Sequence, residues 1–334
     1  MTAHPWLVCG VAGLELSPEE RELLEELQPG GVILFARNIA SPGQVRELVA
    51  AVRSLPGKPY VAVDLEGGRV NRLRSLVGEL PSPQLLAQHG EVAARELGEV
   101  CGALCAVLGI HVDLAPVVDV AGARSYIGGE ERCWGDGIRE VVRLGKAFLE
   151  GLETFGVRGC LKHFPGLGSG DVDSHRELPV LADEVKGQRE VFSALAAPHR
   201  AVMVAHALAP ALGEALAPAS CSPRIVGLVP KNSGPILADD LEMGALEPWG
   251  SLGERAAAAL LAGCHQVLLC NALEARREVA EYVDFWAPRD PQLGFRLAAA
   301  KKKLASFAEG ELARVSWEEA LERVEELRAR WGGG

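Results

Sequence analysis

Short runs rich in β-branched residues alternate with longer amphipathic stretches along the whole chain of 334 residues. This alternation is typical of a parallel sheet whose strands are connected by helices. We expect eight strands, at residues 7–10, 32–35, 60–64, 110–114, 159–162, 201–205, 235–238 and 266–270. Ser17, Ser41, Ser222 and Ser316 precede helical patterns, and each is expected to cap its helix.

Eight strand–helix units without a Pro/Gly/Ser-rich linker predict an α/β protein with a single (β/α)8 TIM-type barrel. An open doubly wound sheet is the alternative. Such a sheet usually carries Gly-x-Gly-x-x-Gly after its first strand, and residues 9–13 do not match that pattern. We therefore expect one domain over residues 1–334, with C-terminal helices from about residue 290 packed on the barrel. In the last helix, the pairs Glu319/Arg323 and Glu326/Arg330 are expected on a solvated face.

The composition excludes several classes of partner. The 45 acidic and 34 basic side chains give a net charge of −11, which argues against a nucleic-acid partner. No apolar run approaches the roughly 20 residues that cross a membrane. The first nine residues also lack the basic end of a secretion signal. These observations predict a soluble, cytoplasmic protein without a membrane partner.

The eight cysteines are expected to be reduced core residues, because most of them lie in apolar runs. Cys101 and Cys105 share a helix face, but no second pair with finger-like spacing follows them. The sequence therefore predicts no metal site.

Charged and polar residues follow five of the expected strands, at the barrel end where active sites lie. They are Asp64, Glu66, Arg69 and Arg72 after the third strand, Lys162 and His163 after the fifth, His206 after the sixth, Asp239, Asp240 and Glu242 after the seventh, and Asn271 after the eighth. Any one of them is readily explained as an ion pair that caps a strand. Together they indicate a site for a polar ligand.

Asp173 and His175 lie two residues apart in an extended segment and can face the same side. A carboxylate in that position would orient the imidazole and raise its pKa, giving a proton donor near neutrality. The intervening Ser174 points elsewhere, so a hydrolase triad is not favoured. The spacing alone fits a surface Asp–His pair equally well.

Two motifs, Lys162-His163-Phe164-Pro165-Gly166 and Asp173-Ser174-His175, resemble the signature of glycoside hydrolase family 3. The similarity is to its β-N-acetylhexosaminidase branch. Other segments match in the family's order from about residue 7 to about residue 305. These segments are residues 31–38, 64–70, 115–119, 202–206 and 239–243.

The resemblance implies a retaining exo-β-N-acetylglucosaminidase on a barrel, without a metal or organic cofactor. It implies that Asp239 is the nucleophile and that His175, with Asp173 as its partner, is the general acid/base. A small carbohydrate is the implied substrate, from muropeptides or chito-oligosaccharides, and peptidoglycan recycling is the implied process. The implied substrate-binding positions are Asp64, Arg72, Arg132, Lys162, His163 and His206.

The sequence departs from the family's pattern at a few positions. Leu167 replaces a His in the Pro-Gly-His-Gly turn, His265 replaces an Asp near the eighth strand, and the segment before Arg132 is longer than usual. Three alternatives stay open: a β-glucosidase, a glycoside phosphorylase, and a catalytically weak sugar-binding barrel. The oligomeric state is also open, with a monomer as one option.

Overall fold

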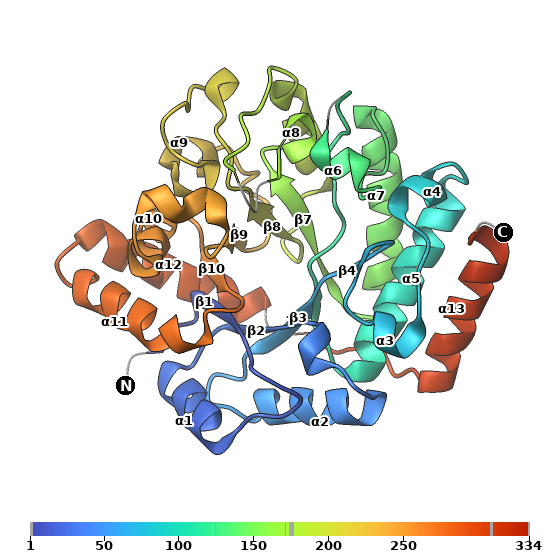
Figure 1. Ribbon diagram of the computed structural model, residues 1–334, viewed down its shortest axis with the longest axis horizontal. Helices are drawn as coiled ribbons and strands as arrows, with labels where there is room; N and C mark the ends of the chain where they lie inside the picture. The colour runs from blue at the N-terminus through green and yellow to red at the C-terminus, as the bar shows by residue number, and fades with distance from the viewer. Residues whose placement is uncertain (1–2, 124, 171, 174–176, 308–309, 333–334) are drawn as a thin grey trace.

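The computed structural model is a closed barrel of eight strands surrounded by helices (Figure 1). It describes residues 3–123, 125–170, 172–173, 177–307 and 310–332. The order around the barrel is β1-β10-β9-β8-β7-β6-β3-β2, and every neighbouring pair is parallel. The predicted (β/α)8 barrel is therefore confirmed, and the open doubly wound sheet is excluded.

All eight expected strands are present, with ends that differ from the expected ones by no more than two residues. The barrel strands are β1 (Leu7–Gly10), β2 (Gly31–Leu34), β3 (Tyr60–Val63), β6 (Val112–Asp113), β7 (Arg158–Phe164), β8 (Ala201–Val204), β9 (Ile236–Asp240) and β10 (Gln266–Leu269).

The helices begin where the sequence predicts caps. The side chains of Ser17, Ser41, Ser222 and Ser316 each accept a hydrogen bond from a backbone N–H of the first turn. The α-helices are α1 (Pro18–Leu27), α2 (Pro42–Arg53), α3 (Arg74–Val77), α4 (Pro83–Ala87), α5 (Glu91–Leu108), α6 (Tyr126–Gly129), α7 (Ile138–Glu153), α8 (Val185–Leu195), α9 (Pro223–Val226), α10 (Leu252–Ala262), α11 (Arg276–Trp286), α12 (Pro291–Phe307) and α13 (Trp317–Trp331). Short 3₁₀ turns are η1 (Ala36–Asn38), η2 (Leu167–Ser169), η3 (Pro210–Leu212), η4 (Ala219–Cys221), η5 (Gly244–Trp249) and η6 (Leu273–Ala275). No helix in the described part of the chain combines the length and the apolar composition that crossing a membrane requires.

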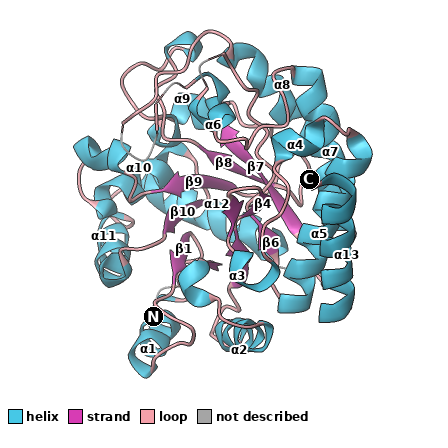
Figure 2. Ribbon diagram, turned by 45° about the vertical axis from the view of Figure 1, so that its right-hand side comes forward, coloured by secondary structure: helices cyan, strands magenta, loops and turns pink. Residues whose placement is uncertain are grey.

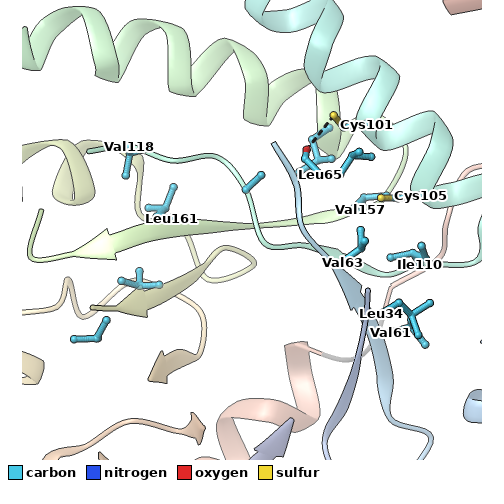
Figure 3. Packing of buried hydrophobic residues seen from close by; sticks show 14 of the residues in the cluster. Leu34, Val61, Val63, Leu65, Cys101, Cys105, Ile110, Val118, Val157 and Leu161 are labelled. Atoms are coloured by element: carbon cyan, nitrogen blue, oxygen red, sulfur yellow. Dashed lines mark hydrogen bonds between the residues drawn. The ribbon is translucent and has the colours of Figure 1, made fainter. Parts of the chain in front are cut away.

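Alternating side chains of each strand belong to two different cores. Val61 and Val63 face outward to the helices, whereas Ala62 faces the barrel interior. The helices enclose the strands on all sides (Figure 2), which buries the outward set. Between β3, β7 and α5, aliphatic side chains pack together, and the Cys101 thiol donates to the carbonyl oxygen of Leu65 at 3.2 Å (Figure 3).

The two last helices contact different parts of the barrel. The Phe307 ring of α12 is buried in the interior core, with its centroid 5.8 Å from that of Tyr60. Helix α13 lies along α5 (Figure 1). Its arginines do not form the expected pairs within α13. Arg323 instead pairs with Glu99 and Arg330 with Glu96, because both acids lie on the facing side of α5.

A short hairpin follows β3 and was not predicted. Its strands are β4 (Leu65–Gly67) and β5 (Val70–Asn71), which pair antiparallel. The turn uses Gly67 and Gly68 with φ of 89° and 56°, values that glycine adopts without steric cost. The hairpin carries Glu66, and Arg72 follows it directly.

Candidate active site

A cavity of about 320 Å³ opens at the C-terminal ends of the barrel strands. Six of the nine predicted site residues line it: Asp64, Arg72, Arg132, Lys162, His163 and Asp239. They come from four separate regions of the sequence, after β3, before α7, within β7 and at the end of β9. The barrel thus brings them together as its geometry requires.

Lys162 is the centre of a buried charge network on one wall of the cavity. Its Nζ lies 2.8 Å from Oδ1 of Asp64 and 2.6 Å from Oε1 of Glu66. Glu66 also accepts two hydrogen bonds from Arg132, each 2.8 Å long. Burial alone would raise the pKa of the Glu66 carboxyl, but Arg132 and Lys162 hold it well below its usual range. The network therefore holds fixed charges beside the cavity.

Arg72 completes this wall from the end of the hairpin. Its Nη2 lies 3.7 Å from Oδ2 of Asp64, and its guanidinium lies 5.5 Å from the ring centroid of Phe35. Asp64 is only half-buried, so its carboxylate can accept hydrogen bonds from a ligand while Lys162 and Arg72 orient it.

His163 lines the cavity because β7 is irregular there. Successive strand residues normally face opposite sides. The pairing of β7 with β8 shifts between Leu161 and Phe164, and both Lys162 and His163 reach the cavity. The ring Nδ1 of His163 lies 2.8 Å from Oδ2 of Asp119, a completely buried carboxylate. Asp119 also accepts from the backbone N–H groups of His163 and Leu167.

Asp239 ends the seventh barrel strand and faces the same cavity. Burial would raise the pKa of its carboxyl, but the neighbouring His163, His206 and Lys162 lower it below its usual value. Its Oδ1 accepts a hydrogen bond from the backbone N–H of Asp240 at 2.9 Å. The side chain is therefore ionised at neutral pH and is available as a nucleophile or an electrostatic stabiliser.

His206 lies behind the cavity and is not among the residues that line it. It is completely buried, with Nδ1 2.7 Å from the hydroxyl of Ser220 and Nε2 3.0 Å from the carbonyl oxygen of Asp240. Since burial lowers its pKa, the ring is neutral and Nε2 donates to that carbonyl. This placement favours positioning of the Asp239–Asp240 backbone over direct sugar contact.

The predicted Asp173–His175 pair is described only in part. Asp173 is half-buried, and its carbonyl oxygen accepts a hydrogen bond from the backbone N–H of Glu177 at 3.0 Å. Ser174 and His175 lie outside the described residues, so their expected orientation stays a prediction.

The structure shows the surroundings of Leu167 and His265, two positions at which the sequence departs from the pattern it resembles. The side chain of Leu167 lines the cavity, and its backbone N–H donates to Asp119 at 2.6 Å. His265 lies just before β10 at the opposite end of the strand from the cavity, where its Nδ1 accepts from the backbone N–H of Ile236 at 3.0 Å. Burial, with Lys303 and Arg296 nearby, lowers the pKa of His265 to about 4, which suits an acceptor nitrogen.

Glu66 was grouped with the charged residues after the third strand but was given no role, and Asp119 was not predicted as a site residue. Glu66 follows β3 and is noticeable as a carboxylate, but its contact with Arg132 joins residues 66 positions apart. Asp119 ends the apolar run Val117-Val118, and a charged residue at that place was a usable signal. Within the described residues, no group of three or more His, Cys, Asp or Glu side chains is arranged to hold a metal ion.

The chain is similar to known proteins over most of its length. The model of the family described as "Glycosyl hydrolase family 3 N terminal domain" matches residues 7–286. A "Beta-hexosaminidase" of Pseudomonas aeruginosa (strain LESB58) is 38% identical over 277 residues, covering 79% of this chain and 82% of the relative. A glycoside hydrolase family 3 β-N-acetylglucosaminidase from a Paenibacillus species superposes with a TM-score of 0.82 at 28% identity, over 98% of this chain and 67% of that one. NagZ from Neisseria gonorrhoeae in complex with N-trifluoroacetyl-D-glucosamine has a TM-score of 0.81 at 28% identity, over 97% of this chain and 98% of that one.

Proposed function

The chain belongs to glycoside hydrolase family 3, and we propose that it is a retaining exo-β-N-acetylglucosaminidase. Its substrates are muropeptides or chito-oligosaccharides that end in β-linked N-acetylglucosamine. The observation that carries the proposal is the ionised Asp239 at the end of β9, in a cavity that Asp64, Lys162 and Arg132 also line. The names of the relatives and the glucosamine derivative bound to the gonococcal protein support the choice of sugar.

Each residue has a distinct part in the proposed reaction. The carboxylate of Asp239 attacks the anomeric carbon as the glycosidic bond breaks, which forms a covalent glycosyl-enzyme. His175, oriented by Asp173, gives its proton to the departing oxygen. It then takes a proton from the water that attacks the anomeric carbon and releases Asp239. Asp64, Arg72, Arg132, Lys162 and His163 hold the sugar, and His206 holds the strand end that carries Asp239.

We also propose that the enzyme acts in the cytoplasm, in peptidoglycan recycling. All eight cysteines are free thiols, and seven of them are buried. Eight cysteines without a disulfide are typical of a protein in a reducing compartment, because thiols stay reduced there.

A panel of 4-nitrophenyl glycosides, assayed with and without phosphate, tests the activity. We expect release of nitrophenol from the N-acetyl-β-glucosaminide, with free N-acetylglucosamine as the sugar product. Preferred turnover of the β-glucoside indicates a β-glucosidase, and a sugar 1-phosphate indicates a phosphorylase. Binding of N-acetylglucosamine without turnover of any glycoside indicates a sugar-binding barrel.

The first sugar product should keep the β configuration, because two successive displacements at the anomeric carbon restore it. Proton NMR of the reaction in its first minutes distinguishes the anomers before they equilibrate. Initial appearance of the α-anomer means that water attacks directly and that Asp239 forms no covalent bond.

Asp64→Ala and Lys162→Ala should each lower kcat/KM tenfold to a hundredfold. Each substitution removes hydrogen bonds to a charged group, worth about 1.5–3 kcal/mol, and leaves a buried charged partner uncompensated. Steady-state kinetics on the nitrophenyl substrate measures the loss. Glu247→Gln, an exposed carboxyl on η5, serves as the control. Wild-type kcat/KM in both cavity variants would make these residues structural caps of their strands.

A further inference from the structure

Two consecutive carboxyls at the end of β9 reach the cavity, although adjacent residues of a regular strand face opposite sides. Val267 of β10 pairs with Ala238, whereas the next residue, Leu268, pairs with Asp240. Two residues of β9 therefore span one residue of β10, as in a β-bulge. As a result, Asp239 and Asp240 both line the cavity.

The two carboxyls have different surroundings. Asp239 faces Lys162 and His163, which favour its charged form. Asp240 accepts a hydrogen bond from the backbone N–H of Glu242 at 3.2 Å and another from the Cys270 thiol. Burial raises the pKa of Asp240 to about 7, and the negative charges of Glu242 and Asp239 contribute to this rise. Two neighbouring carboxyls with divergent pKa values are typical of an acid and a base with separate functions.

The elements packed around Asp240 offer it no cation within ion-pair distance among the described residues. Glu242 belongs to the segment after β9, and its carboxylate accepts from the backbone N–H of Asn271 at 2.7 Å. Two arginines lie on neighbouring elements, Arg37 on η1 and Arg255 on α10. Both donate their hydrogen bonds to groups other than Asp240. Arg37 donates to Val11, Cys270 and Asn271, and Arg255 donates to Gly250 and Leu241. The other titratable groups around Asp240 are Asp64, which lies near Cys270, and Lys162, His163 and His206, which lie near Asp239.

Apart from the His163 imidazole, the charges of the cavity lining balance when Asp240 is neutral. The carboxylates of Asp64, Glu66, Glu130 and Asp239 are then matched by Arg69, Arg72, Arg132 and Lys162. A proton on Asp240 also gives the cavity a group that both donates and accepts hydrogen bonds. Sugar hydroxyls and the acetamido carbonyl accept such a bond.

We propose that Asp240 is a specificity-determining acid of this cavity, which binds the sugar in its protonated form and donates a hydrogen bond to it. When Asp240 loses its proton above neutrality, the bond is lost and a second negative charge appears beside Asp239. Sugar binding then weakens. This inference rests on the proposed function, since it takes the bound sugar to be the ligand.

The pH profile of kcat/KM on 4-nitrophenyl N-acetyl-β-glucosaminide tests the proposal, because it reports groups of the free enzyme. This substrate needs little protonation of its leaving group, so the proposed acid His175 contributes little to its alkaline limb. In the wild type, kcat/KM should fall tenfold to a hundredfold between pH 7 and pH 9, the effect of about 1.5–3 kcal/mol. Asp240→Asn keeps a donor that does not ionise, so its profile should stay flat over that range.

Two further variants check the electrostatic cause. Glu242→Gln removes a negative charge beside Asp240, which makes ionisation easier and should move the alkaline limb to lower pH. Glu247→Gln removes a charge from the same segment at an exposed position and should leave the limb in place. An unchanged limb in Asp240→Asn, or no movement in Glu242→Gln, overturns the proposal.

A measurement on the wild type covers the case in which Asp240→Asn does not fold. Calorimetric titration with N-acetylglucosamine at pH 8, in two buffers of different ionisation enthalpy, counts the protons taken up on binding. Uptake approaching one proton per sugar at pH 8, with almost none at pH 6, supports the proposal, and no uptake at pH 8 contradicts it. The proposed function fails differently, through absence of nitrophenol release at every pH.

Discussion

Asp239→Asn should have no measurable turnover, with a loss of at least about 10³-fold in kcat, the scale expected when an essential group of a covalent catalyst is removed. An amide does not form the glycosyl ester, so the first step has no nucleophile. Asparagine has nearly the same volume as aspartate, and its oxygen can still accept the 2.9 Å hydrogen bond from Asp240 N. The fold should therefore persist, which circular dichroism and a thermal melt verify.

A fluorinated mechanism-based glycoside should identify the nucleophile directly. Such a substrate slows hydrolysis of the covalent intermediate, so that digestion and mass spectrometry locate the modified residue. We expect the label on Asp239, and we expect Asp240→Asn to be labelled there as well. A label on Asp240 or Glu242 would show that the nucleophile had been assigned to the wrong carboxyl.

The alternation of strands and helices was sufficient to predict the barrel, because short buried strands and capped helices leave local signals. The ends of the strands were harder to predict than the barrel itself. β7 runs on to Phe164, two residues beyond its expected end, because its shifted pairing keeps the polar Lys162 and His163 inside the strand. The β4–β5 hairpin was missed because its strands have only three and two residues.

The site was predictable residue by residue but not as a network. The resemblance indicated Lys162, Asp64 and Arg132, yet nothing local shows that Glu66 joins Lys162 to Arg132. The same holds for Asp119, whose contact with His163 spans 44 positions. Such contacts depend on tertiary packing that one sequence does not display. The single-domain organisation of residues 1–334 stays a prediction, as does the part of His175.

His175→Ala should lose much more activity on a disaccharide than on a nitrophenyl glycoside. A sugar alkoxide is a poor leaving group that needs a proton, whereas nitrophenolate departs largely unaided. The difference in the loss of kcat/KM between the two substrates should be about 10²-fold or more, the contribution of general-acid catalysis. Kinetics on both substrates in the wild type and the variant measures it.

Two comparisons separate proton transfer from simple positioning. With the activated substrate, hydrolysis of the glycosyl-enzyme should limit turnover in His175→Ala, because the base that activates water is also missing. Azide attacks without a general base and should restore turnover of that substrate. Asp173→Asn should show a milder form of the same pattern, since the ring loses its orienting carboxylate and becomes less basic. An equal loss on both substrates, without rescue by azide, would mean that His175 only positions the sugar or its loop. The proton donor would then have to be another group, and Glu242 would be the next carboxyl to test.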